Sequence, residues 1–337
     1  MTLKELAQKI GLSPTTVSRA LNGYPEVNAE TRARVEEAAA KYGYQPNNMA
    51  RRLATGRAMA IGHVIPLTEH QMINPVFAEF MLGASEIYSE QGYDTILRTV
   101  DVNGEEDAYR ELARRRAVDG VIVHAPRRDD PRIALLRELN MPFVMHGRPV
   151  EADEGSVWLD INNHRSFAEA TRHLIGLGHS KIALINGLER ISFAVRRRAG
   201  VEEALGEAGI DIRPDWIISQ EMTETNGYAA AERLLSSGDR PTAILTSNIM
   251  TAIGAGRAAR DAGLTLGQDL SLITHDDDLS FLSNAGDPPR FTAMRSSISE
   301  AGHKCAEMLL NLIAGESVSP VVWNSVFVQG RSTGPLE

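Results

Sequence analysis

The spacing of apolar residues along the chain changes once, near residue 58. Before this point apolar side chains recur every three or four positions in short runs, which is the period of an amphipathic helix. Beyond it, short continuous apolar runs alternate with longer stretches of helical period, which predicts strands and helices in turn. We therefore expect a small helical head followed by an α/β body.

The head, residues 1–46, is expected to form a three-helix domain. Its second helix has the clearest start signal, because Ser13 is a favoured N-cap and Pro14 occupies the first helical position. A third helix is expected to follow Asn28 and to end at Gly43. Short helices joined by a glycine-containing turn predict a helix-turn-helix arrangement.

The body, residues 58–337, has the pattern of two doubly wound parallel sheets. The strand-like runs are AIGHVI (60–65), YDTILRT (93–99), GVIVHA (120–125), PFVMHG (142–147), KIALING (181–187), TAILTS (242–247) and LSLITH (270–275). Helical stretches separate most of these runs, which is typical of a parallel sheet covered by helices. The pattern occurs once before about residue 150 and again after about residue 160, so two similar lobes are expected.

The end of the chain is expected to cross back between the lobes through a helix at 298–314 and a strand at 321–328. The expected boundaries are about 58–159 plus 291–322 for lobe 1, and about 160–290 plus 323–337 for lobe 2. Ligands of such sheets bind at the carboxyl ends of the strands, which two lobes place across a cleft.

Composition limits the class of protein. The chain has 337 residues, of which 43% are hydrophobic and 23% charged, so more than one globular unit is expected. No apolar run approaches the roughly 18 residues of a membrane span, and the N-terminus lacks the layout of a secretory signal. Cys305 is the only cysteine, which excludes an intrachain disulfide and a thiolate metal cage. A cytoplasmic protein without a membrane partner is expected.

Charge is distributed unevenly along the chain, whose formal net charge is −9. Residues 1–57 hold nine Lys and Arg against five Glu, whereas the remainder holds 26 basic and 39 acidic residues. A basic head on an acidic body indicates an anionic polymer bound at one end, although charged runs are often only solvated surfaces.

The helix at 14–21 has two distinct faces. Its inner face is expected to carry Val17, Ala20 and Leu21, and its outer face Thr15, Thr16 and Arg19. A solvated helix surface is one interpretation of the outer face. The other is a recognition helix in the DNA major groove, where Arg forks onto guanine and Thr contacts a thymine methyl. Ser13 and Ser18 are then candidate phosphate contacts.

Several segments resemble the lac repressor/gal repressor (LacI/GalR) family of transcription factors. These are TLKELAQKIGLSPTTVSRALNG, ETRARVEEAAAKYGYQPNNMARRLATGR, LIGLGHSKIALING and the closing GRST. The resemblance implies a sequence-specific DNA-binding regulator, most simply a repressor, that is a homodimer or a tetramer. It also implies a core of the periplasmic-binding-protein type, control by a small-molecule effector, and neither catalysis nor a cofactor.

The resemblance further implies a hinge helix within residues 47–57, which lies in the minor groove of operator DNA. Leu53 matches the family's wedge leucine, which unstacks a central base step, and Ala54 follows it. Contacts with DNA are also expected from Asn22, Asn48 and Arg51. The alternative is that Leu53 and Met49 pack under the body.

Polar residues follow several of the expected strands, namely His124, His146 to Arg148, Asn248, and His275 with Asp276. Their convergence indicates a small hydroxylated ligand. The resemblance implies that Arg197 anchors a sugar effector, that Asn248 and Asp276 bind sugar hydroxyls, and that Asn74 and Phe77 line the pocket. His124 and Arg148 are additional candidates. The expected effector is a sugar such as an α-glucoside or disaccharide, with a purine or a phosphorylated sugar as alternatives.

Two other classes of protein fit parts of the sequence. A nicotinamide-dependent enzyme is suggested by GAGRAA (254–259), with Asp276 twenty residues after Gly256. However, these glycines lie inside an expected helix instead of following a strand, so close packing of this helix on the sheet explains them better. A sugar-binding protein of transport systems fits the body, but the basic head argues against it.

Overall fold

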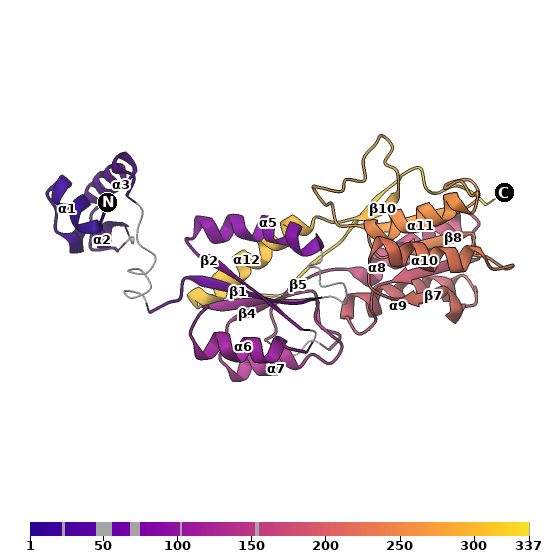
Figure 1. Cartoon of the computed structure of the whole chain (residues 1–337), viewed down its shortest axis with the longest axis horizontal. Helices are drawn as coiled ribbons and strands as arrows, with labels where there is room; N and C mark the ends of the chain where they lie inside the picture. Colours follow the sequence, from indigo (N-terminus) through magenta and orange to yellow (C-terminus); the bar gives the residue numbers. More distant parts are fainter. Residues whose placement is uncertain (22–23, 45–55, 68–74, 102, 152–154, 337) are drawn as a thin grey trace. The chain divides into compact units, whose positions relative to one another are not determined.

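The computed structural model describes residues 1–21, 24–44, 56–67, 75–101, 103–151 and 155–336. The chain divides into two compact units, Met1–Met59 and Ala60–Glu337 (Figure 1). Each unit has its own buried apolar core.

The first unit contains the three expected helices. They are α1 (Leu3–Ile10), α2 (Pro14–Leu21) and α3 (Ala29–Tyr42). Each begins at a side chain that accepts a backbone N–H: Thr2 for α1, Ser13 for α2 and Asn28 for α3. Apolar side chains from all three helices meet in one core, so the helix-turn-helix prediction is confirmed.

The second unit contains two six-stranded sheets, which define the two lobes. The lobe 1 sheet has the order β11-β5-β4-β3-β1-β2, and all of its pairs are parallel. Its strands are β1 (Ala60–Pro66), β2 (Asp94–Val100), β3 (Gly120–His124), β4 (Phe143–His146), β5 (Trp158–Ile161) and β11 (Val321–Trp323). Its helices are α5 (Pro75–Glu90), α6 (Glu105–Arg114), α7 (Pro131–Glu138) and α12 (Ile298–Ala314). Helices α5 and α12 cover one face of this sheet, and α6 and α7 the other (Figure 1).

The lobe 2 sheet has the order β12-β10-β9-β8-β6-β7, and only its edge strand β12 is antiparallel to its neighbour. Its strands are β6 (Ile182–Asn186), β7 (Ile217–Ser219), β8 (Ala243–Thr246), β9 (Ser271–Asp276), β10 (Thr292–Arg295) and β12 (Val326–Val328). Its helices are α8 (Asn163–Gly176), α9 (Ser192–Glu207), α10 (Glu224–Leu235) and α11 (Ile249–Asp261), with a short 3-10 turn at Pro214–Trp216. The predicted α/β class with two doubly wound lobes is confirmed.

Three details of the prediction differ from the structure. Strand β10 was expected in lobe 1, within 291–322, but it pairs with β9 in lobe 2. The single strand expected at 321–328 is two strands, since β11 pairs in lobe 1 and β12 in lobe 2. Strand β5 was not expected at all, and its pairing with β4 extends the lobe 1 sheet to Ile161. These differences arise because strands of both sheets have the same local pattern, and only their partners decide the lobe.

The glycines of GAGRAA lie within α11, which supports their role in packing. A Cβ added to Gly254 would lie 2.1 Å from the carbonyl oxygen of Glu224 and 2.6 Å from the backbone nitrogen of Tyr228. The close approach is thus to helix α10, whereas packing on the sheet was expected. Among the residues that the structure describes, no helix is long and apolar enough to cross a membrane.

We expect Gly254→Ala to lower the free energy of unfolding by about 1–3 kcal/mol, because the new methyl group would overlap the α10 backbone. The matched variant is Gly256→Ala, whose Cβ would lie 3.4 Å from Cδ1 of Leu266 and 3.7 and 3.8 Å from two ring carbons of Phe291, all at ordinary van der Waals distance. It should be neutral or stabilising, since Ala favours a helix over Gly by up to about 1 kcal/mol. Urea unfolding of the two variants measures the difference, and equal effects would contradict the packing role.

Candidate functional site

The outer face of α2 is available for contact with a ligand. Thr15 and Arg19 are exposed, whereas Val17 and Ala20 of the same helix are buried in the head core. This separation of faces agrees with the predicted recognition helix. Thr16 and Ser18 are half-buried at its edge.

Ser13 already has a structural role, since its Oγ accepts the backbone N–H of Thr16 at 3.0 Å.

Two basic residues of the head have hydrogen-bond partners within the head. A guanidinium nitrogen of Arg34 donates to the carbonyl oxygen of Ile10 at 2.6 Å, and one of Arg32 donates to that of Tyr24 at 3.1 Å. Part of the positive charge of the head therefore holds the three helices together.

Several candidate residues lie outside the described part of the chain. They are Asn22, Asn48, Arg51, Leu53 and Ala54 of the expected DNA-binding surface, and Asn74 of the expected effector site.

In lobe 2, Arg197 on α9 is a buried cation held by two hydrogen bonds and two aromatic rings. Its Nε donates to Oδ1 of Asn163 at 2.7 Å, and its Nη1 donates to the carbonyl oxygen of Ser247 at 2.6 Å. The guanidinium carbon lies 4.9 Å from the ring centre of Phe167 and 4.8 Å from that of Phe193. Burial lowers the pKa of Arg197 to about 10, so the side chain remains charged at neutral pH.

The arginines on either side of Arg197 point to other partners. Arg198 forms ion pairs with Glu202 at 2.7 Å and with Glu189 at 3.0 Å. Arg196 donates to the carbonyl oxygen of Pro149 at 2.7 Å and thereby connects α9 to lobe 1. Among these three neighbours, Arg197 is the one buried next to the ends of the lobe 2 strands.

Lobe 1 contributes an opposite charge that sequence reasoning missed. Asp160, on β5, is only 3% exposed, and its Oδ2 lies 3.7 Å from Nε of Arg148. Neither of these two buried atoms has a hydrogen-bond partner among the described residues. Burial raises the pKa of Asp160 to about 6, although Arg148, Arg196 and Arg197 act to lower it. Asp160 lies near the carboxyl end of its strand, so recognising 158–161 as a strand would have identified it.

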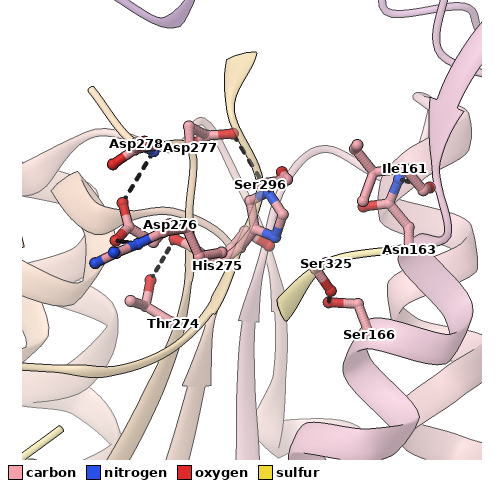
Figure 2. A network of polar contacts seen from close by, with 12 residues as sticks. Ile161, Asn163, Ser166, Thr274, His275, Asp276, Asp277, Asp278, Ser296 and Ser325 are labelled. Atoms are coloured by element: carbon pink, nitrogen blue, oxygen red, sulfur yellow. Dashed lines mark hydrogen bonds and ion pairs between the residues drawn. The ribbon is translucent and has the colours of Figure 1, made fainter. Parts of the chain in front are cut away.

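The carboxylates after β9 divide into two roles (Figure 2). Asp276 is buried, and its Oδ2 accepts from Nε of Arg295 at 3.1 Å, while its Oδ1 accepts the N–H of Asp278 at 3.0 Å. Asp277 lies 3.4 Å from Nε2 of His275. Burial acts to raise the pKa of Asp277, but nearby His275, Arg197 and His146 together lower it. Asp277, which the sequence did not single out, therefore interacts electrostatically with groups of both lobes, as Asp160 does.

Asn248 is also engaged in local structure. Its Oδ1 accepts the N–H of Thr251 at 2.8 Å and caps α11, and its Nδ2 donates to the carbonyl oxygen of Met222 at 3.1 Å. Buried and with both polar atoms paired, Asn248 positions the start of α11.

An aromatic wall lines the strand ends of lobe 1. His124 and His146 are paired in register on β3 and β4. The ring centre of Phe77 lies 5.1 Å from that of His124, and the ring centre of Phe80 lies 4.7 Å from that of His146. Burial lowers the pKa of His146 to about 4, so its ring is neutral at neutral pH.

We call the groups that influence one another electrostatically across the two lobes the interlobe cluster, and it comprises His146, Arg148, Asp160, Arg197 and Asp277. Four buried polar atoms without a partner among the described residues lie in or beside it, namely Nε of Arg148, Oδ2 of Asp160, Nε of Arg196 and Nδ1 of His275, while others, such as the Tyr109 hydroxyl, lie elsewhere. Unpaired buried polar atoms are unusual in folded proteins and call for a partner such as a ligand. Two surface hollows, one lined by residues around His303 and one by residues around Arg290, lie elsewhere. The cluster is therefore identified as a candidate site by its unpaired buried polar atoms and not by a surface hollow.

Comparison with known proteins decides the family. Residues 2–47 match bacterial regulatory proteins of the lacI family, and residues 58–327 match the periplasmic binding proteins and sugar binding domain of the LacI family. The chain belongs to the LacI family. Like other LacI-family members it is a DNA-binding transcriptional regulator with an effector-binding core, as the helix-turn-helix and two-lobed body predict.

Three similar proteins extend over nearly the whole of this LacI-family chain. The HTH-type transcriptional regulator AglR of Rhizobium meliloti (strain 1021) is 42% identical and covers 99% of this chain and 95% of its own. The lac repressor dimer bound to operator and the anti-inducer ONPF has a TM-score of 0.77 at 26% identity, covering 99% of each chain. The transcriptional regulator CelR–cellobiose complex has a TM-score of 0.73 at 28% identity, covering 98% and 99%.

We expect Asp160→Asn to change how stability depends on pH. The pKa of Asp160 in the folded protein, about 6, lies above the ordinary value of an unfolded Asp, about 3.9. The protonated carboxyl therefore stabilises the folded state at low pH, and this contribution, about 3 kcal/mol, is lost as pH rises through 6. Urea unfolding between pH 4.5 and 7.5 should show a smaller fall in stability for the variant.

The matched control is Asp261→Asn, which removes an exposed carboxylate at the end of α11. The neutral histidines of lobe 1 affect all three proteins equally and cancel in the comparison. The assignment fails if Asp160→Asn and the wild type show the same pH dependence.

Proposed function

We propose that this LacI-family regulator is a repressor that binds a palindromic operator as a homodimer or tetramer. A disaccharide, such as an α-glucoside, bound at the interlobe cluster would control its operator affinity. The observation that carries the proposal is the set of unpaired buried polar atoms between two lobes of a sugar-binding-domain fold. The cellobiose in the CelR complex supports a saccharide of this size.

For DNA, we propose that Thr15, Thr16 and Arg19 read base edges in the major groove. The exposure of Thr15 and Arg19 supports this role. Ser13 and Ser18 would contact phosphates at the ends of the same helix. Asn22, Asn48, Arg51, Leu53 and Ala54 would extend the contact, the last four from the hinge segment with Leu53 as the wedge.

For the effector, we propose Arg197, Arg148 and Asp277 as charged contacts with sugar hydroxyls. His124, Phe77 and Asn74 would line the lobe 1 side. In this proposal Asp277 has the sugar-binding role that was expected of Asp276, because the carboxylate of Asp276 is engaged in an ion pair with Arg295. Asn248 and Asp276 would then hold the surrounding loops in position.

Control of DNA binding by the effector would be a linkage between two arrangements of the lobes. Direct contacts already join the lobes, since Oε2 of Glu79 accepts from the N–H and the hydroxyl of Ser280 at 3.0 and 2.8 Å. A ligand at the interlobe cluster would favour the arrangement in which its own contacts form. If DNA favours another arrangement, each ligand weakens the other by the same factor, typically about 1–3 kcal/mol.

The proposal includes no catalytic step and no cofactor, and it places the protein in the cytoplasm with its operator. A transport-type binding protein is disfavoured by the match of residues 2–47 to the DNA-binding domain of the family.

We expect Arg19→Ala to weaken operator binding by about 1–3 kcal/mol and to relax base preference at one position, because a forked contact with guanine is lost. Its charge-matched control is Lys4→Ala, an exposed residue of α1. Fluorescence anisotropy with operator and scrambled duplexes measures both affinities. An equal loss on the two duplexes for Arg19→Ala would show that this residue contacts only phosphate.

A thermal-shift screen identifies the effector class. Maltose, sucrose, trehalose and cellobiose are compared with hypoxanthine and glucose 6-phosphate, because a ligand that binds only the folded state raises its apparent stability. We expect a shift with at least one disaccharide. A shift with hypoxanthine alone would replace the proposed effector class by a purine.

We expect Arg197→Lys to remove the response of operator binding to that disaccharide while leaving operator affinity unchanged. Lysine keeps the charge but loses the planar fork that donates to Asn163 and Ser247. The matched control is Arg198→Lys, whose side chain pairs with glutamates near the surface. A normal response in Arg197→Lys, or its loss in Arg198→Lys, would contradict the assignment of the anchor.

A further inference from the structure

A chain of hydrogen bonds runs through the core of lobe 1 to the aromatic wall. The hydroxyl of Tyr88, on α5, lies 3.3 Å from Nε2 of His63, on β1. Nδ1 of His63 lies 3.0 Å from Nε2 of His124, at the end of β3. Tyr88 and His63 are fully buried, whereas His124 is half-buried. The chain therefore connects a sealed interior to a residue with access to the strand ends.

All three groups are neutral at neutral pH. Burial lowers the pKa of His63 to about 3 and holds the pKa of His124 well below its ordinary value. Burial also raises the pKa of Tyr88, so its hydroxyl keeps its proton. A neutral imidazole carries one N–H donor and one acceptor nitrogen. The two hydrogen bonds must consequently point in the same direction, either from Tyr88 through His63 to His124 or the reverse.

Only one of the two directions provides an acceptor for the hydroxyl proton of Tyr88. If Nε2 of His63 carried the proton, it would donate to the Tyr88 oxygen, and the Tyr88 hydroxyl would need a separate acceptor. In the described part of the chain this hydroxyl has no other hydrogen bond. A buried hydroxyl without an acceptor is costly, about 1–3 kcal/mol. The favoured direction is therefore Tyr88 O–H to His63 Nε2, then His63 Nδ1–H to His124 Nε2.

We propose that Tyr88 and His63 are positioning residues that hold His124 as the Nδ1–H tautomer, so that His124 offers a hydrogen-bond donor to an oxygen of the effector. The inference rests on the proposed effector function of the same site. The Nδ1 and Nε2 atoms of an imidazole point to different sides of the ring. Because Nε2 faces the interior, Nδ1 faces away from it, and no described residue accepts from Nδ1.

This arrangement determines specificity through the kind of hydrogen bond that the site offers. Phe77 and Phe80 meet the His124 ring edge to face, with ring centres 5.1 and 4.8 Å away, and hold its orientation. A fixed donor recognises a hydroxyl or glycosidic oxygen that accepts a hydrogen bond. Ligands that present only a donor at this point, such as an ammonium group, leave both partners unsatisfied and are rejected.

The tautomer is measured directly by long-range 1H–15N correlation spectra of histidine-labelled, full-length protein. We expect protonated Nδ1 and unprotonated Nε2 for both His63 and His124. Tyr88→Phe should abolish this preference, because the phenyl ring no longer donates to His63. Tyr109→Phe is the control, since Tyr109 is another buried lobe 1 tyrosine whose hydroxyl has no partner among the described residues. Protonated Nε2 on both rings of the wild type would overturn the inference.

The role of the donor is tested with two amide variants of His124. Asparagine places its amide near the position of Nδ1, whereas glutamine places its amide near that of Nε2. Calorimetric titration with maltose, sucrose, trehalose and cellobiose should show that His124→Gln weakens binding about tenfold, and His124→Asn much less. Equal losses in the two variants, or none in either, would overturn the donor role.

The effector class and the tautomer of His124 are tested independently of each other. If none of the four disaccharides binds the wild type, the proposed effector class is wrong, and the spectra still decide the tautomer. If a disaccharide binds but Nε2 carries the proton, the effector function stands and the inference on Tyr88 and His63 falls.

Discussion

Three crossings of the chain between two parallel sheets hold the effector-binding core together. The chain leaves lobe 1 between β5 and α8, returns between β10 and α12, and leaves again between β11 and β12. Because each crossing follows the carboxyl end of a strand, the strand ends of the two sheets are tethered to one another. Polar side chains at these ends must therefore share one region between the lobes, and the interlobe cluster follows from this connectivity.

The interlobe cluster contains both compensated and uncompensated buried charges. Arg197 has hydrogen bonds and two aromatic rings around it, so its burial is compensated within lobe 2. Arg148 and Asp160 are not compensated to the same degree, since Nε of Arg148 and Oδ2 of Asp160 lie 3.7 Å apart and neither atom has a hydrogen-bond partner among the described residues. Buried polar groups that lack partners destabilise a protein unless another molecule completes them. The site is thus maintained at some expense to stability, which is common where function requires it.

In the head, one short helix both contributes to the core and exposes polar side chains to solvent. Val17 and Ala20 attach α2 to the core, and the opposite face of the helix keeps Thr15 and Arg19 outside. Arg34 uses its charge to bind the carbonyl end of α1 at Ile10. Arg34 therefore stabilises the domain internally, whereas Arg19 stays exposed on the outer face of α2.

The sequence by itself determined the helices of the head, the α/β class and the existence of two lobes. Those features depend on local causes, such as the caps at Ser13 and Asn28 and the period of apolar residues. Only the tertiary structure decided which sheet receives β10, that Asp276 pairs with Arg295, and how Tyr88, His63 and His124 connect. These outcomes depend on partners distant in sequence, and neighbouring residues with identical local patterns acquire different roles when different strands and helices pack against them.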